Sequence, residues 1–162
     1  MFRLLVIAHA FVLLGMGSVC AEDVPAKQPS ETTTTLNALE QAFVEQMTDA
    51  VLVGQFSING RENEEAKVER YAIQGLKKLG RDRWIITARI TYGDIDIPLP
   101  VPVKIFWSDD TPVLSLTGLT IPGLGQGFTT RLLFYEDRYA GIWYHGKAGG
   151  HMWGTIEKEA GE

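Results

Sequence analysis

The residues of this 162-residue chain best suited to chemistry lie in the stretch Tyr139–Lys158. It contains His145 and His151 together with Trp143 and Trp153. Imidazole nitrogens bind zinc, copper and nickel. Tryptophan rings offer flat faces to sugars, heterocycles and apolar chains. This stretch therefore suggests either a metal site or an aromatic platform for a ligand.

The glycine-rich segment 146–150 predicts a hairpin with a five-residue loop. In that register His145 lies opposite His151, and Trp143 lies opposite Trp153. Directly opposed residues of antiparallel strands have Cβ atoms about 5 Å apart, so we expect both pairs on one face. A four-residue loop would break these pairs, whereas the five-residue loop keeps each face chemically coherent.

The histidine pair is too small a ligand set for a metal. A tetrahedral site needs further ligands, and the chain beyond residue 21 has no cysteine and no third histidine. We therefore expect no metal and no cofactor, and interpret the histidines as a surface pair beside a turn. The tryptophan pair has two interpretations: a ligand platform, or cross-strand packing that binds nothing.

Catalytic groups are not apparent elsewhere in the sequence. The carboxylates of Asp94, Asp96 and the Asp109-Asp110 pair fall in or beside turns, where such groups are usually solvated. Serine elbows, a catalytic cysteine and a phosphate loop are not found. The sequence thus predicts a protein that is not an enzyme.

The chain from Val51 onward follows the period of two that is typical of β-strands. Trp84, Ile86 and Ala88 alternate with Ile85 and more polar residues, and short turn signals separate such runs. The predicted strands are 51–59, 67–78, 82–92, 99–107, 112–117, 128–135, 139–145 and 151–158. Eight sequential strands joined mostly by short turns favour an all-β, antiparallel up-and-down barrel, with a β-sandwich as the alternative.

Two segments of this barrel are unusual. Pro98, Pro100 and Pro102 lack backbone donors on one side of their strand, which predicts an edge or a gap in the barrel there. The apolar, glycine-rich segment 116–128 is expected to be the longest irregular loop. It would either fold back as a plug over one end of the barrel or act as a lid over a cavity.

One short helix is expected before the strands. Asn37 followed by Glu40 is a capping-box pattern. Leu39, Phe43 and Met47 then recur at helical spacing, which predicts an amphipathic helix over 38–49.

The N-terminal region has the features of an export signal. Arg3 precedes an apolar run and a small-x-small pattern ends at Ala21, so residues 1–21 are predicted to be a signal peptide. Residues 22–36 are expected to be a flexible linker and 37–160 a single domain. The protein would be periplasmic or extracellular. Alternatively, a lipid on Cys20 would anchor it to a membrane.

Composition limits the partners of this domain. The chain is 45% apolar, enough for one core, and carries a net charge of −5 without a basic stripe. Nucleic acid is therefore not an expected partner. An envelope protein remains a possible partner, and the sequence does not determine the oligomeric state.

Three segments carry a resemblance to known proteins. The residues LVGQFSING at 52–60, LTGLTIPGLG at 116–125 and the stretch around YAGIWYHGKAGGHMWGTI are similar to a group of small uncharacterised exported bacterial proteins. This resemblance implies a bacterial origin and a single domain, and brings no activity. The Gly141-Ile142-Trp143 triplet resembles, more loosely, the G-x-W signature of calycin barrels such as lipocalins and avidins. That signature belongs near the first strand in those proteins, so no binding residue is carried over.

The leading hypothesis is an exported, non-catalytic barrel that binds a small or apolar molecule in its cavity or at its mouth. The competing hypothesis is an envelope interaction protein whose barrel is filled by its own side chains. A cavity of several hundred Å³ would favour binding. The residues expected to contact a ligand are Trp143, Trp153, His145, His151, Trp84, Trp107 and Tyr71.

Overall fold

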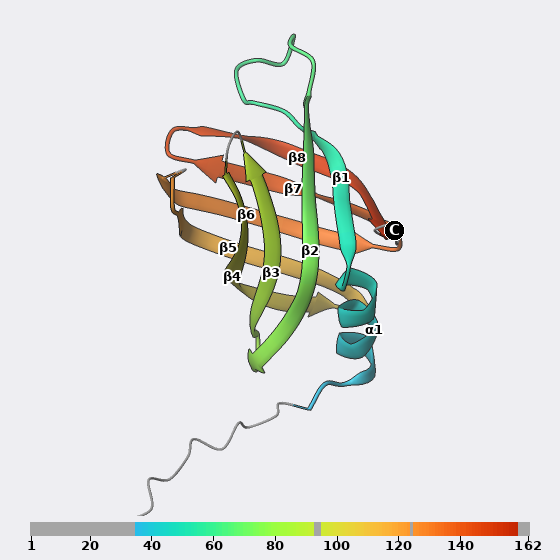
Figure 1. Ribbon diagram of the computed structural model, residues 1–162. Helices are drawn as coiled ribbons and strands as arrows, with labels where there is room; N and C mark the ends of the chain where they lie inside the picture. The colour runs from blue at the N-terminus through green and yellow to red at the C-terminus, as the bar shows by residue number, and fades with distance from the viewer. Residues whose placement is uncertain (1–34, 93–94, 124, 159–162) are drawn as a thin grey trace, which may run out of the picture. The chain divides into compact units, whose positions relative to one another are not determined.

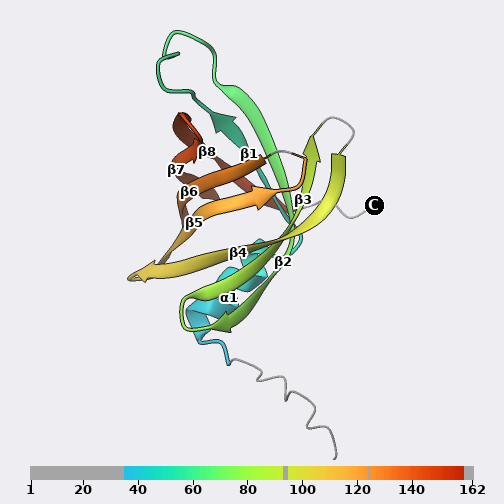
Figure 2. The ribbon, with the colours of Figure 1, turned by 90° about the vertical axis from the view of Figure 1, so that its left-hand side faces the viewer.

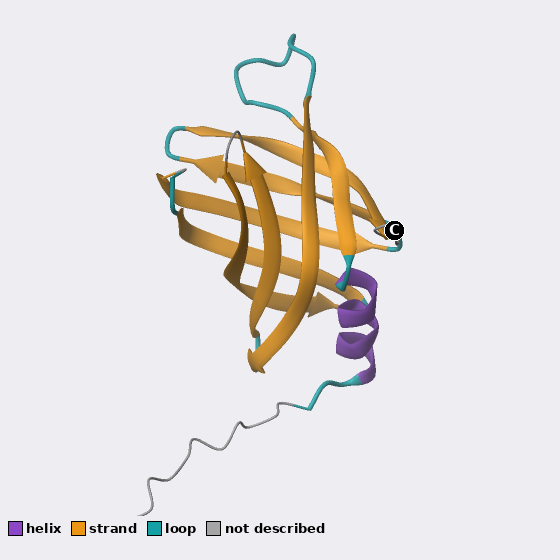
Figure 3. Cartoon of the chain, viewed as in Figure 1, coloured by secondary structure: helices purple, strands orange, loops and turns teal. Residues whose placement is uncertain are grey.

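The computed structural model describes residues 35–92, 95–123 and 125–158. They form one helix followed by eight antiparallel strands in sequence order, closed into a barrel, as predicted (Figure 1, Figure 3). The elements are α1 (Ala38–Met47), β1 (Ala50–Phe56), β2 (Lys67–Gly80), β3 (Arg83–Tyr92), β4 (Ile95–Ser108), β5 (Thr111–Ile121), β6 (Gly125–Tyr135), β7 (Arg138–His145) and β8 (Ala148–Lys158). The signal peptide and most of the linker that the sequence predicts lie outside the described residues.

Helix α1 begins at the predicted capping box and closes one end of the barrel. The Asn37 side chain accepts a hydrogen bond from the Glu40 amide (2.9 Å), and the Glu40 carboxylate accepts one from the Asn37 amide (3.0 Å). The second Glu40 oxygen pairs with Lys78 of β2 at 2.6 Å. Phe43 and Met47 are buried and point their side chains into the core. The helix therefore seals the end at which β1 starts and β2 ends (Figure 1).

Three tight turns lie at this same end, and each has a non-glycine residue with a positive φ. Arg81, Asp109 and Glu136 adopt left-handed φ values of 47°, 54° and 50° in the β2–β3, β4–β5 and β6–β7 turns. Such values suit two-residue hairpins because they match the twist of the paired strands. At the opposite end, residues 57–66 connect β1 to β2 in a longer loop (Figure 1).

The pairing between β4 and β5 is short and stops before the three prolines, where the sequence predicts an edge or a gap. Residues Lys104–Ser108 pair with Thr111–Ser115, but Ile95–Val103 pair only with β3. Pairing with β3 continues through all three prolines, so their missing donors face the unpaired side. Figure 2 shows β4 diverging from β5 away from their shared turn.

The expectation of a long loop over 116–128 is wrong. Strand β5 continues to Ile121 and β6 starts at Gly125, so the connection is only residues 122–124. The glycines accommodate irregular pairing within the strands. Gly118 and Gly127 have φ values of 66° and 89°, and the register shifts twice between β5 and β6. This segment is therefore neither plug nor lid, but part of the barrel wall.

The predicted register of the last hairpin is also wrong. A two-residue turn, Gly146-Lys147, joins β7 and β8, with Gly146 at a left-handed φ of 61°. Trp143 pairs with Gly150 and His145 with Ala148. The same register places Trp153 opposite Ala140 and His151 opposite Ile142. Neither the histidines nor the tryptophans form cross-strand pairs.

The glycines explain this difference in register. A Cβ added to Gly149 would lie 2.5 Å from Cδ1 of Tyr144, and one added to Gly150 would lie 3.1 Å from Nε1 of Trp143. Both glycines therefore belong to β8, where Gly149 leaves room for the Tyr144 ring and Gly150 leaves room for the Ser57 carbonyl group and the Trp143 indole beside it. The glycine-rich sequence alone predicts a loop at these positions instead.

Candidate functional site

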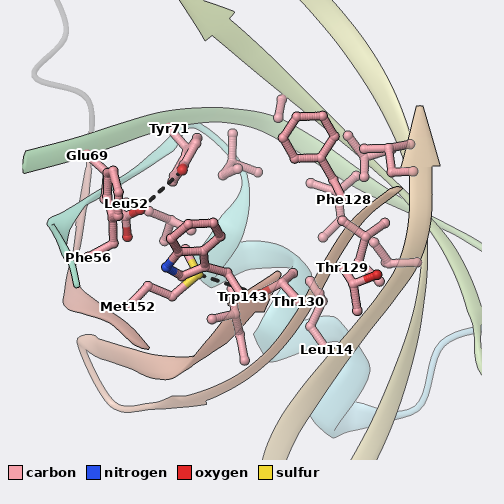
Figure 4. Close-up of a pocket in the computed structure, with 18 of the residues that line it drawn as sticks. Leu52, Phe56, Glu69, Tyr71, Leu114, Phe128, Thr129, Thr130, Trp143 and Met152 are labelled. Carbon is pink, nitrogen blue, oxygen red and sulfur yellow. Dashed lines mark hydrogen bonds between the residues drawn. The ribbon is translucent and has the colours of Figure 1, made fainter. Parts of the chain in front are cut away.

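The barrel encloses a cavity of about 530 Å³, which lies within the roughly 300–1,000 Å³ of typical small-molecule sites. Its wall is mostly aliphatic and aromatic (Figure 4). Met47 of α1 lies at the closed end. Phe128 and His145 line the cavity at the other end and are only partly buried, so the cavity reaches solvent there. The lining residues are Met47, Leu52, Phe56, Glu69, Tyr71, Ile73, Ile86, Ala88, Val101, Val103, Leu114, Leu116, Leu119, Ile121, Phe128, Thr129, Thr130, Leu132, Phe134, Trp143, Tyr144, His145 and Met152.

Three of the residues proposed from the sequence line this cavity: Trp143, His145 and Tyr71. They come from β7 and β2, and their side chains belong to the inward-facing sets of these strands. Figure 4 shows Trp143 and Tyr71 on the same side of the cavity.

The other four proposed residues lie elsewhere. Trp84 is buried at 1% exposure, and Lys78 lies over its ring at 5.8 Å. Trp107 packs edge-on against Phe43 of α1 at 6.0 Å. These two tryptophans therefore support the junction of barrel and helix. His151 and Trp153 are exposed on the outer face of β8.

A row of four residues across four strands forms the polar part of the site. Glu69 pairs with Gly54, Gly54 pairs with Gly154, and Gly154 pairs with Tyr139. Because the two middle residues have no side chains, the Tyr139 ring extends over them. Its hydroxyl donates a hydrogen bond to Oε1 of Glu69 at 2.8 Å. Glycine at positions 54 and 154 thus allows β7 to reach β2.

The carboxylate of Glu69 is held in an apolar environment. Glu69 is only 7% exposed, and Oε2 of its carboxylate accepts a second hydrogen bond from the Tyr71 hydroxyl at 3.1 Å. Burial raises the pKa of Glu69, while the hydrogen bonds from Tyr139 and Tyr71 partly oppose this rise. Burial and the nearby carboxylate also raise the pKa of both tyrosines well above their usual range. Both phenols therefore stay protonated and act as donors.

Trp143 lies across a glycine in the same way. Its Nε1 passes Gly150 and donates to the Ser57 carbonyl oxygen at 3.1 Å. The ring also meets Phe56 edge-on at 5.5 Å. The indole N–H is thus satisfied by the protein, and the ring contributes an apolar surface to the cavity.

The open end carries a second aromatic contact. His145 stacks on Phe128 at 3.8 Å with an interplanar angle of 15°, and both residues line the cavity. A Cβ at Gly125, which has a φ of 104°, would lie 3.5 Å from Nε2 of His145. The stacked pair forms one side of the cavity near the β5–β6 turn.

Glu69 is the main site residue that sequence reasoning missed. A signal for it was present, because Glu69, Tyr71 and Ile73 share one period-two set in β2. The residues that alternate with these three include the apolar Val68, which is 76% exposed. Both faces of β2 therefore mix apolar and polar residues, and the sequence pattern does not show which face is buried. The contact with Tyr139, 70 residues away, had no sequence signal.

Within residues 35–92, 95–123 and 125–158, no three His, Cys, Asp or Glu side chains come together as a metal site. In the same described ranges, the only helix is too short and too polar to cross a membrane.

The fold and site define a small, closed antiparallel β-barrel with an internal apolar cavity, in which Glu69 is the one acidic residue among the described lining residues. This architecture is compatible with a calycin-like barrel. Comparison with protein-family models, curated proteins and solved structures gave no match. The resemblance to small exported bacterial proteins therefore stays a prediction, and function has to be argued from the geometry of the site.

Proposed function

We propose that this protein is an exported, non-catalytic barrel that binds one small apolar molecule in its cavity. The observation that carries this proposal is the hollow, largely apolar interior of about 530 Å³, which reaches solvent at the end opposite α1. A barrel that served only as a scaffold would gain stability by filling this space with side chains. An interior filled by side chains, as the competing hypothesis expected, does not fit this cavity.

The polar groups of the cavity support binding rather than catalysis. Tyr71 and Tyr139 each donate a hydrogen bond to Glu69, and the indole N–H of Trp143 donates to a backbone carbonyl oxygen. The described residues that line the cavity include no serine, cysteine or lysine, and Glu69, the one acidic residue among them, is held by two tyrosine hydroxyls. Groups of this kind orient a ligand in an apolar pocket.

A titration with pyrene, a neutral apolar fluorophore, tests the proposal. Saturable binding of one pyrene per chain is expected. Ala88→Phe places a large ring into the cavity, because Ala88 is 8% exposed and lines it. The variant should bind at least roughly tenfold more weakly. Ala42→Phe, at an exposed position of α1, is the matched control and should bind as the wild type does. Unchanged affinity in Ala88→Phe, or no saturable binding at all, would contradict the proposal.

Export is proposed from the signal peptide expected at residues 1–21. Expression of the full chain in a bacterial host, followed by intact-mass measurement, should give a mature protein that starts at Glu22. A lipid-modified chain that starts at Cys20 would support the anchored alternative instead, and an uncleaved chain would contradict both.

Interaction with an envelope protein is a second candidate function, and exposed apolar residues on the outer surface of the barrel support it. Val68, Trp153 and Leu133 are 76%, 42% and 45% exposed. Cross-strand pairing through Gln55 and Ala140 places them in one row over β2, β1, β8, β7 and β6. Exposed apolar rows of this kind mark interaction surfaces. Native mass spectrometry of the protein from its own host would show a retained partner. Trp153→Ser should weaken the binding of that partner.

A further inference from the structure

The cavity contains one buried acidic group without a balancing cation. Of the described residues that line the cavity, Glu69 is the only acidic one, and no lysine or arginine is among them. In the described part of the chain, Glu69 receives hydrogen bonds only from the hydroxyls of Tyr71 and Tyr139, and none of the residues there forms an ion pair with it. Two neutral donors do not cancel the charge of a carboxylate.

The protein holds this carboxylate in place at a structural cost. Two strands carry glycine, at positions 54 and 154, so that the Tyr139 hydroxyl can reach Glu69 from β7. Glycine within a strand is unfavourable by about 0.5–1 kcal/mol relative to alanine. A buried charge that served no purpose could be replaced by an apolar residue, as elsewhere on this wall. The orientation of the carboxylate is therefore a built feature of the cavity.

Aromatic rings lie next to the carboxylate. Figure 4 shows Phe56, Tyr71 and Trp143 gathered around the end of the cavity where Glu69 lies. All three line the cavity, and the Phe56 and Trp143 rings contact each other. Ring faces attract cations, most strongly where water is excluded. The Glu69 carboxylate and the aromatic rings thus both favour a positively charged ligand group.

We infer that the cavity binds an amphiphilic cation: an apolar chain or ring system that carries a single protonated amine, with the amine on Glu69 and the apolar part along the aliphatic wall. This inference rests on the proposed binding function and names its ligand class. An apolar molecule ending in a carboxylate, such as a fatty acid, is disfavoured because two negative charges would be buried together. A neutral alcohol of the same length would donate one hydrogen bond without charge pairing.

The test compares three probes of equal chain length: decylamine, decanol and decanoate. Each is titrated calorimetrically into the full mature protein at neutral pH, below its micelle-forming concentration. Decylamine is expected to bind roughly 10- to 100-fold more tightly than decanol, since hydrogen bonds to charged groups are stronger than neutral ones. Decanoate is expected to bind most weakly.

Two variants assign the preference to the proposed group. Glu69→Gln keeps the shape and acceptor oxygen of the side chain but removes the charge, so its amine preference over decanol should disappear while decanol binding stays. Retained decanol binding also shows that the variant is folded. Glu65→Gln removes the same charge from an exposed position in the β1–β2 loop and should keep the preference.

The outcomes separate the two proposals. If the three probes bind wild-type protein equally, or if Glu69→Gln keeps the preference for decylamine, the cavity binds apolar molecules but the inferred ligand class is wrong. If decanoate binds most tightly, the inferred class is likewise wrong. If none of the three binds, the proposed function fails and this inference fails with it.

Discussion

The row Glu69–Gly54–Gly154–Tyr139 makes a sharp prediction about alanine at position 154. An added Cβ would lie 2.6 Å from the Gly54 Cα and 2.8 Å from Cε1 of Tyr139, and it would also overlap the Val53 carbonyl oxygen. Two of these neighbours are backbone atoms of β1, which pairs with β8 along its whole length. The overlap can be relieved only if the strands separate or the Tyr139 ring moves.

Two losses contribute to the expected destabilisation by Gly154→Ala. Overpacking of a close-packed site costs about 1–3 kcal/mol. A displaced Tyr139 ring also loses its 2.8 Å hydrogen bond to Glu69, and bonds to charged groups contribute about 1.5–3 kcal/mol. The free energy of unfolding should therefore fall by about 2.5–6 kcal/mol. That is a large part of the roughly 5–15 kcal/mol of a typical domain.

Urea unfolding followed by tryptophan fluorescence and far-UV circular dichroism measures this change. Gly75→Ala in β2 is the matched control. A Cβ there meets no atom within 4 Å, and neither glycine has a left-handed φ, so only the available space differs. Gly75→Ala should leave the free energy of unfolding within about 1 kcal/mol of wild type, or raise it slightly.

Tyr139→Phe separates the two contributions, because it removes the hydroxyl and keeps the ring. It should cost about 1.5–3 kcal/mol, less than Gly154→Ala. The reasoning is refuted if Gly154→Ala costs no more than Tyr139→Phe, or if Gly75→Ala is as destabilising as Gly154→Ala.

Three further predictions follow from other parts of the barrel. Burial raises the pKa of Glu69 above its ordinary value of 4.5, so the folded state keeps the carboxyl proton to higher pH than the unfolded chain does. The contribution of Glu69 to stability therefore falls as the pH rises from 4.5 through the raised pKa. Glu69→Gln should therefore become more stable relative to wild type as the pH of the urea titrations rises above 4.5, and a constant difference would contradict the burial argument. Lys78→Met leaves a buried glutamate of α1 without its cation and should cost about 3 kcal/mol of unfolding free energy, whereas Lys104→Met, from an exposed pair, should cost at most about 1 kcal/mol; equal losses would count against this difference. Pro100→Thr restores a donor on the unpaired side of β4 and should promote dimers or larger species in analytical ultracentrifugation, while Pro122→Thr in the β5–β6 turn should not; a monomeric Pro100→Thr would show that proline does not protect this edge.

Local features of the sequence predicted the eight strands and the helix, and favoured a barrel over a β-sandwich. Period-two alternation, short turn signals and the Asn37–Glu40 capping box depend on neighbours a few residues apart, so they are visible in one dimension. The three prolines also correctly predicted that β4 has an unpaired edge. A missing N–H donor at alternate positions prevents pairing on one side, whatever the rest of the fold does.

The glycines show where local reasoning failed. Gly146 occupies a turn with a left-handed φ, whereas Gly149 and Gly150 lie in a regular strand and leave room for Tyr144 and Trp143. In the sequence all three look like loop residues. Their roles differ because the space beside a strand residue is set by the residue on the neighbouring strand, and this depends on register.

The number of strands, the capped helix and the interrupted edge can be read from the amino-acid sequence, since each follows from the chemistry of neighbouring residues. The set of residues that form the site depends on the closed barrel. Closing the barrel turns Glu69 inward, and the glycines at 54 and 154 let Tyr139 reach it across two strands. The physical reason is that burial and hydrogen bonding of a side chain depend on strands distant in sequence, whose pairing no local pattern encodes.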